Sequence, residues 1–490
     1  MKNVLAFDLG ASSGRAVAAA FDGKTLSLSE VHRFANEPVM LGSTFYWDTL
    51  RLLHEIKTGI SKANLTGTRF DSLGVDTWGV DFGLLRPDGR LVDNSVHYRD
   101  ARNAAMPAEV FSRLPAREIY ASTGIQTMDL NTLFQLYYLA TREPEQLERA
   151  DSLLFTPDLL NFFLSGVRAA EYSIASTSQL LDARARTWDD ALFEKLGLPR
   201  RLMQDIVAPG TTLGRLTPAI CDELNVPALD IVASAGHDTA AAVAAVPHTD
   251  GSTWAYLSSG TWSLLGLELD EPVLSDAAFE ANFTNEGGVN RTTRFLKNII
   301  GLWLMQETRR AWIRESGPIS FREIDALTEK AAPLVRFIDP DYPEFSRPGN
   351  MPRRFDEYLA RTGQAPCTFR GDYSRMITES LALKYRTAIE NLERVTGRHI
   401  DVLHVIGGGV QDRLLCQCTA NAIGRPVVAG PIEATAIGNC LVQLLASGEF
   451  ASLAEARACV RDSFPITVYE PQDAALWDDA YARFTRITEQ

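Results

Sequence analysis

One pattern of apolar and polar residues occurs twice along the chain. In residues 4–21 and again in residues 254–269, an apolar run leads into a turn of small residues and leaves as a second apolar run. Each run suits a buried strand, and the glycine, serine and threonine residues suit a tight turn between paired strands. The two copies lie about half a chain apart and share little residue identity. A chance likeness of two glycine hairpins is the alternative, but the matching positions favour a duplicated α/β domain.

The apolar residues outside these hairpins predict further helices and strands. Helical spacing marks residues 47–63 and the long amphipathic segment 373–395. Residues 103–200 are mostly helical by pattern, with breaks at prolines. Further elements are expected as a strand pair within 72–85, a strand at 294–297, helices at 298–310 and 320–332, a strand from 402 that opens onto three glycines at 407–409, a helix from 411, a last strand at 426–428 and a closing helix from 433.

A strand-to-helix turn lies at the middle of the chain. Residues 231–233 are apolar and partly β-branched, residues 240–246 are mostly alanine, and a Gly-His-Asp-Thr turn at 236–239 stands between them. This places Asp238 at a helix N-terminus, where the helix dipole stabilises a carboxylate. Asp238 is therefore a helix cap, a carboxylate available for chemistry, or both.

Composition restricts the class of protein. A chain of 490 residues with 46% apolar and 22% charged residues is typical of a soluble protein of two or three domains. The apolar run from Val4 ends at Asp8, too short for a signal-peptide core, and no uncharged run is long enough to span a bilayer. Six cysteines are too few for a disulfide framework in so long a chain. We therefore expect a cytoplasmic protein with reduced thiols and no membrane contact.

The net charge of −14 argues against a general nucleic-acid surface. An anionic ligand would have to be held locally, by backbone amides, one or two basic side chains or a metal ion. Two turns offer such amides: the first hairpin turn, with Asp8 before it and Arg15 after it, and the glycines at 407–409. Either could be an ordinary glycine turn, although three consecutive glycines cost folding entropy.

A Trp78-Gly79 corner interrupts the predicted strand pair between Asp76 and Asp81. Glycine at such a corner lets a ligand approach the backbone closely. A tryptophan face with carboxylates and amides is a frequent setting for sugars, but a tryptophan in a strand is more often part of the core. The corner is a candidate sugar site.

Several motifs resemble those of the FGGY carbohydrate kinases and occur in the same order: residues 8–15, 236–240, 257–263 and 407–409. Residues 75–82, 284–288 and 296–303 are most similar to the family members that phosphorylate L-rhamnulose. The first turn of the wider family commonly has threonine after the glycine, whereas this chain has Ala11, Ser12 and Ser13. That variant also resembles the rhamnulose subgroup and weakens xylulose or glycerol as the substrate. The resemblance extends from Asp8 to about residue 439.

This resemblance implies an actin-like, ribonuclease H-like α/β fold of duplicated mixed-sheet domains around a cleft, with domains at 1–246 and 247–490. The implied reaction transfers phosphate from ATP to O1 of L-rhamnulose, with Mg²⁺ as cofactor. Asp238 would be the catalytic base, ionised at neutral pH because the reference pKa of aspartate is about 3.9, and Asp8 would hold Mg²⁺ through water. The residues implied to contact the ketose are Gly79, His237, Asp238, Thr239 and Asn298. The residues implied to contact ATP are Ala11, Ser12, Ser13, Gly14, Arg15, Thr261, Gln306 and Gly408.

Other interpretations stay open on the sequence alone. An FGGY kinase of another deoxy-ketose, such as L-fuculose, would share the motifs. A chaperone or filament ATPase would share the fold, which does not specify function by itself. A sugar sensor without activity would lack Asp238 or Asp8, and both are present. The expected partners are ATP and a small ketose, and the expected assembly is a monomer or a small homo-oligomer.

Overall fold

The computed structural model describes residues 1–248 and 251–489, which form two compact units. The first unit contains the described residues up to 248 together with Glu268–Leu296 and Ala434–Phe464. The second contains the described residues from 251 to Leu267, Lys297–Glu433, and those from Pro465 onward. Two segments from the C-terminal half of the sequence therefore fold with the first unit. No helix in the described chain has the length and apolar character needed to cross a membrane.

The first unit is built on a six-stranded sheet with the order β13-β14-β6-β1-β2-β3. Strand β1 pairs antiparallel with β2 and parallel with β6, and β14 also runs parallel to β6. The predicted first hairpin is thereby confirmed. The strands are β1 (Lys2–Leu9), β2 (Ser13–Phe21), β3 (Leu26–Ala35), β6 (Ser72–Thr77), β13 (Thr211–Arg215) and β14 (Asp230–Ala233).

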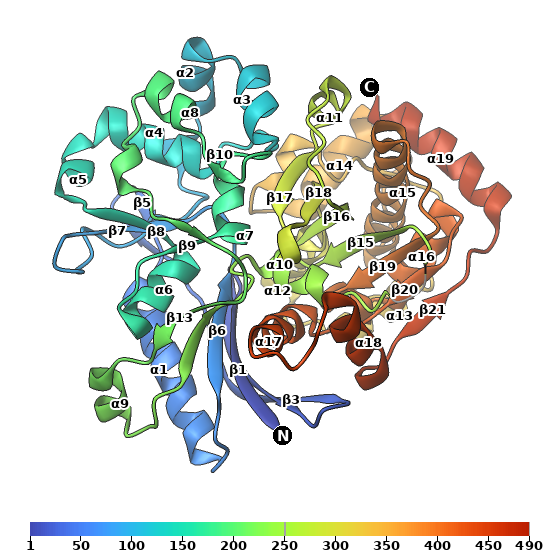
Figure 1. Ribbon diagram of the computed structural model, residues 1–490. Coiled ribbons are helices and arrows are strands. Elements are labelled where there is room, and N and C mark those ends of the chain that lie inside the picture. The colour runs from blue at the N-terminus through green and yellow to red at the C-terminus, as the bar shows by residue number, and fades with distance from the viewer. Residues whose placement is uncertain (249–250, 490) are drawn as a thin grey trace. The chain divides into compact units, whose positions relative to one another are not determined.

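Helices bury both faces of this sheet. On one face, α1 (Thr49–Leu65), α6 (Thr156–Ser165) and α9 (Pro218–Leu224) share an apolar core with strand residues such as Phe7 and Leu73; Figure 1 shows α1 and α6 beside β6. The second helical layer consists of α10 (Asp238–Ala244) and α17 (Ala434–Ala446). These two helices can approach closely because Gly438 has no side chain: a Cβ there would lie only 1.7 Å from the carbonyl oxygen of Ala241.

The segment between β6 and β14 is mostly helical, as predicted. It contains α2 (Met106–Arg113), α3 (Ala116–Thr123), α4 (Thr132–Arg142), α5 (Pro144–Arg149), α7 (Tyr172–Ala175), η2 (Ser176–Ser178) and α8 (Asp190–Leu196). Its short strands include β7 (Phe82–Leu85), β8 (Ser152–Phe155), β9 (Ala170–Glu171), β10 (Leu181–Asp182), β11 (Thr187–Trp188) and β12 (Ile206–Val207). The predicted strand pair within 72–85 is wrong, because β6 joins the large sheet whereas β7 pairs with β8.

A second sheet has the order β17-β18-β16-β15-β19-β20-β21. Here β15 pairs antiparallel with β16 and parallel with β19, the same arrangement that β1 has with β2 and β6. The duplication that the two hairpins predicted is therefore present in the sheets. The strands are β15 (Trp254–Ser259), β16 (Trp262–Leu269), β17 (Thr284–Gly287), β18 (Thr293–Ile300), β19 (Val402–Ile406), β20 (Val427–Ala429) and β21 (Thr467–Tyr469).

The second unit also confirms the long helix predicted at 373–395, which is α15 (Arg370–Thr396) and lies beside α16 (Arg413–Ile423). Its other helices are α12 (Trp303–Ser316), α13 (Phe321–Thr328), α14 (Met351–Arg361), η6 (Gly408–Gln411) and α19 (Ala474–Thr488). Residues 426–428 are not the last strand, because β21 follows β20. Nor does α17 close the chain, because α18 (Leu453–Ser463) and α19 come after it.

The helix predicted at 298–310 starts too early. Residues up to Ile300 extend β18, and α12 begins only at Trp303. Gly301 separates the two elements at a close contact, since a Cβ there would lie 2.5 Å from Oγ of Ser263. Asn298 is therefore a strand residue.

Candidate active site

Asp238 is the first residue of α10, and His237 is the residue that caps the helix. The amide of Thr77 donates to the carbonyl oxygen of Gly236 at 2.9 Å, which ties this turn to the end of β6. The Asp238 carboxylate accepts from the hydroxyl of Thr239 at 3.0 Å, and the capping residue His237 makes no side-chain hydrogen bond to the amides of α10. The helix-cap interpretation of Asp238 is therefore wrong. The carboxylate, 32% exposed, keeps most of its capacity to accept hydrogen bonds.

Burial and charge shift the acidity of this carboxyl. Burial raises the pKa of Asp238 above its ordinary value; the neighbouring His237 opposes the shift, and Asp8 adds to it. The sequence supplied only the reference pKa of aspartate, because the burial of this turn was not visible in the sequence. A raised pKa makes the ionised carboxylate a stronger proton acceptor than an ordinary aspartate.

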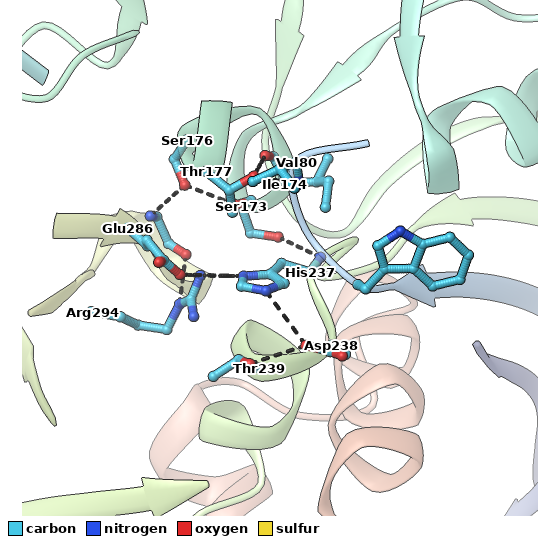
Figure 2. Close-up of polar contacts among 12 residues, drawn as sticks. Val80, Ser173, Ile174, Ser176, Thr177, His237, Asp238, Thr239, Glu286 and Arg294 are labelled. Carbon is cyan, nitrogen blue, oxygen red and sulfur yellow. Dashed lines mark hydrogen bonds and ion pairs between the residues drawn. The ribbon is translucent and has the colours of Figure 1, made fainter. Parts of the chain in front are cut away.

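His237 lies between Asp238 and a buried ion pair (Figure 2). Its Nδ1 is 3.0 Å from Nη2 of Arg294 and 3.3 Å from Oε2 of Glu286, and its Nε2 is 3.5 Å from Oδ1 of Asp238. Arg294 is fully buried, and Glu286 is 6% exposed. Although burial raises the pKa of Glu286, Arg294 and His237 outweigh it and lower that pKa. Glu286 lies within the motif at 284–288, but the sequence alone assigned no role to Glu286 or to Arg294.

One helical turn holds the segments of this site together (Figure 2). Three hydroxyls of α7 and η2 accept backbone amides from three separate segments: Ser173 Oγ from His237 at 3.2 Å, Ser176 Oγ from Gly287 at 2.7 Å, and Thr177 Oγ1 from Val80 at 3.1 Å. Sequence reasoning missed these hydroxyls, which lie in a region assigned only as helical. A cluster of Ser and Thr residues at 173–178 was the available signal.

Gly79 lies against His237. A Cβ at Gly79 would lie 3.4 Å from Nε2 of His237 and 3.4 Å from Oγ1 of Thr177, so any side chain at this position would contact the Nε2 side of the ring. Gly79, His237, Asp238 and Thr239 all belong to the first unit. Asn298 belongs to the second unit.

The first hairpin turn carries the candidate phosphate residues. Gly10 donates its amide to the carbonyl oxygen of Ser13 at 2.9 Å, which closes the turn that contains Ala11 and Ser12. Arg15 donates from Nε and Nη2 to Oδ2 of Asp8 at 3.0 and 2.7 Å. The pair joins the two strands that flank the turn.

Asp8 lies opposite Asp76 in the parallel register of β1 and β6. Asp76 is fully buried, and its Oδ2 accepts from Nδ2 of Asn439 at 2.6 Å. Burial, followed by the charges of Asp8 and Asp238, raises the pKa of Asp76 well above the ordinary value. Its Oδ1 has no hydrogen-bond partner in the described chain.

These carboxylates fit a hydrated magnesium ion. Mg²⁺ prefers oxygen ligands, retains several waters and takes only one or two carboxylates beside phosphate groups. In the part of the chain that the structure describes, no cluster of three or more His, Cys, Asp or Glu side chains forms a ready-made metal cage. The oxygens of Asp8 and the unpartnered Oδ1 of Asp76 suit a cation shared with nucleotide phosphates.

The second unit holds the candidate nucleotide residues. Thr261 lies in the β15–β16 turn and donates to Oε1 of Gln306 on α12 at a long 3.4 Å. The three glycines differ in their structural need. Gly407 has a φ of +85°, and a Cβ at Gly409 would lie 2.0 Å from Oγ of Ser259, whereas a Cβ at Gly408 would meet open space. Fold requirements therefore account for Gly407 and Gly409 but not for Gly408.

Family comparison decides the class of protein. The N-terminal domain model of the FGGY family of carbohydrate kinases matches residues 3–245, and the C-terminal domain model matches residues 255–447. The chain belongs to the FGGY family of carbohydrate kinases. It is an ATP-dependent sugar kinase, as predicted, and the chaperone and filament interpretations lose their support.

Individual relatives narrow the comparison within the FGGY family. The chain is 44% identical to the rhamnulokinase of Bacteroides thetaiotaomicron over 483 residues, 99% of both chains. It is 40% identical to the rhamnulokinase of Enterococcus faecalis, over 97% of this chain and 96% of the relative.

Solved structures confirm the predicted two-domain α/β kinase fold. A gluconate kinase from Lactobacillus acidophilus superposes with a TM-score of 0.83 at 16% identity, covering 100% of this chain and 98% of that chain. A xylulose kinase from the same organism gives a TM-score of 0.81 at 16% identity with the same coverage. At this identity the likeness concerns the fold alone.

Proposed function

We propose that this FGGY kinase transfers the γ-phosphoryl group of ATP to O1 of L-rhamnulose, giving ADP and L-rhamnulose 1-phosphate in rhamnose breakdown. The observation that carries the proposal is the Asp238 carboxylate, which is the first residue of α10, not its cap, and stands beside His237 with its pKa raised. Near-full-length relatives named rhamnulokinase support the choice of ketose.

In this proposal Asp238 is the catalytic base. The ionised carboxylate accepts the proton of the O1 hydroxyl as that oxygen attacks the γ-phosphorus, and the bond from phosphorus to the β,γ-bridging oxygen breaks. The proton ends on Asp238, and ADP leaves. The raised pKa favours this proton transfer, because the carboxylate holds the proton more strongly than an ordinary aspartate would.

The other roles follow the sites described above. Gly79, His237, Thr239 and Asn298 contact the ketose. Ala11, Ser12, Ser13, Gly14 and Arg15 contact the phosphates, and Thr261, Gln306 and Gly408 contact the nucleotide. Asp8 would hold Mg²⁺, and the ion would supply neutralisation of the phosphate charge.

The cellular setting is part of the same proposal. A kinase that consumes ATP and a catabolic sugar is best placed in the cytoplasm, where both are available.

The proposed domains of the sequence are an N-terminal half at 1–246 and a C-terminal half at 247–490. The proposed assembly is a monomer or a small homo-oligomer.

The decisive experiment is a coupled assay of ADP release with L-rhamnulose, L-fuculose, D-xylulose and D-ribulose. We expect the highest kcat/KM with L-rhamnulose, and ³¹P and ¹³C NMR of the product should place the phosphate on C1. Preference for L-fuculose would favour the other deoxy-ketose kinase. If none of the four sugars raises ADP release, the proposed function fails.

A further inference from the structure

Arg294 approaches His237 as a hydrogen-bond donor. A guanidinium group has only N–H donors and stays protonated in proteins. Its Nη2–H is directed at Nδ1 of His237 at 3.0 Å, while its Nε donates to the carbonyl oxygen of Gly287 at 2.9 Å. A donor directed at Nδ1 requires a lone pair there, so Nδ1 carries no proton.

Glu286 could compete for the opposite tautomer but is less well placed. Its Oε2 lies 3.3 Å from Nδ1 and 3.1 Å from Nη2 of Arg294, yet in the described chain Oε2 has no partner with hydrogen-bond geometry. A proton on Nδ1 would also point at the Nη2–H of Arg294, which at 3.0 Å lies closer to Nδ1 than Oε2 of Glu286 does at 3.3 Å. Glu286 instead compensates the charge of Arg294, which a fully buried guanidinium requires.

With Nδ1 unprotonated, the neutral imidazole carries its proton on Nε2. That nitrogen is 3.5 Å from Oδ1 of Asp238, longer than a good hydrogen bond, and it lies on the side of the ring next to Gly79, which has no side chain to cover it. The Nε2–H is therefore available to a ligand oxygen that also lies beside Asp238.

We propose that Arg294, charge-compensated by Glu286, is a positioning residue that fixes His237 as the Nε2–H tautomer, so that His237 donates to a ketose oxygen next to the reacting hydroxyl. The role in catalysis rests on the proposed function, whereas the tautomer itself does not. Because Arg294 donates throughout the working pH range, His237 presents a donor, never an acceptor, to the sugar.

The tautomer can be measured without substrate. Long-range ¹H–¹⁵N NMR on the full-length protein with ¹⁵N-labelled histidine distinguishes protonated from unprotonated ring nitrogens, and His237→Gln assigns the signal among the seven histidines. We expect Nε2 protonated and Nδ1 unprotonated in the wild type. An Nδ1–H tautomer overturns the proposal, and this measurement stands even if a variant fails to fold.

Variants test the consequence for the sugar. The double change Arg294→Leu with Glu286→Gln removes the donor without leaving a buried charge unpaired. We expect loss of the single tautomer and a rise of about 10- to 100-fold in KM for the ketose, with KM for ATP changed less than about twofold. Glu286→Asp keeps both Arg294 and a compensating carboxylate, so it should keep the tautomer. An unchanged ketose KM in the folded double variant contradicts the proposal; a wild type that no ketose stimulates contradicts only the proposed function.

Discussion

Oε2 of Glu171 accepts a hydrogen bond from the amide of Gly236 at 2.9 Å, in the turn that leads to Asp238. The same buried carboxylate accepts the amides of Ser173 and Ile174 at the start of α7. Glu171 thus joins the turn that carries the candidate base to the helical turn whose hydroxyls hold the rest of the site. A Cβ on Gly236 would lie 2.9 Å from this oxygen, so the turn and the carboxylate are closely fitted.

Glu171→Gln should weaken this junction. Oε2 of Glu171 accepts the amides of Gly236 and Ile174, and Oε1 accepts the amide of Ser173. Because the NH₂ group of glutamine must replace one of these oxygens, at least one buried amide loses its acceptor. We expect the free energy of unfolding to fall by about 1–3 kcal/mol and kcat to fall by about 10-fold, measured by denaturant unfolding and the coupled assay. Glu194→Gln, on the exposed face of α8, is the matched control and should change neither.

Asp238→Asn should remove phosphoryl transfer without removing nucleotide binding. Asparagine keeps the shape of the side chain but accepts no proton, so we expect kcat to fall by about 10²- to 10⁴-fold and the ATP affinity, measured by calorimetry, to change by less than about twofold. Asp222→Asn on the exposed surface of α9 is the control. Near-normal turnover by Asp238→Asn would remove the base assignment.

The wild-type pH profile tests the same residue. Burial raises the pKa of Asp238 above 3.8. As the pH is lowered, kcat/KM should therefore begin to fall at a higher pH than it would with an ordinary aspartate as the base. If kcat/KM falls only at or below the ordinary pKa of an aspartate, the result would contradict this role of Asp238.

Sequence patterns predicted the parts of the fold that depend on local spacing. The two hairpins and the long helix α15 were found because apolar periodicity reports directly on strands and helices. The start of α12 was misplaced because Ile299 and Ile300 suit either element, and pairing within the sheet decides it.

Candidate site residues could be grouped from the sequence only where they are neighbours in the chain. His237, Asp238 and Thr239 stand in one turn and could be recognised together. Arg294 and Glu286 could not be connected with His237, because the contact of Arg294 with His237 spans 57 residues and both contacts depend on how β17 and β18 are placed.

Asp81 gives a separate prediction about pH and stability. This fully buried carboxyl accepts from Nε1 of Trp47 at 2.6 Å and Nε1 of Trp78 at 2.9 Å, and burial raises its pKa to about 6. Because the folded-state pKa exceeds the unfolded value, the folded state binds the proton more strongly, and stability is lost as pH rises from about 4 through about 6. We expect this carboxyl to lower the free energy of unfolding by about 1 kcal/mol between pH 5 and 7.5.

Asp81→Asn should remove this contribution. The variant is expected to be less stable overall, because an amide cannot replace every acceptor contact, but its stability should fall less between the two pH values. Tryptophan fluorescence during denaturation at each pH measures the difference, with Trp47 and Trp78 as local probes. Equal pH dependence of the wild type and the variant would show that Asp81 does not titrate in this range.

Gly408 and Gly409 are adjacent but should respond oppositely to alanine. A Cβ at Gly409 would lie 2.0 Å from Oγ and 2.5 Å from Cβ of Ser259, so Gly409→Ala should destabilise the protein by about 1–3 kcal/mol. A Cβ at Gly408 meets open space, so Gly408→Ala should keep the wild-type melting temperature. If ATP lies against this backbone, Gly408→Ala raises KM for ATP by about 10-fold and leaves KM for the ketose unchanged. An unchanged KM for ATP in this well-folded variant would remove Gly408 from the nucleotide site, whereas the loss of stability in Gly409→Ala depends only on the packing of the fold.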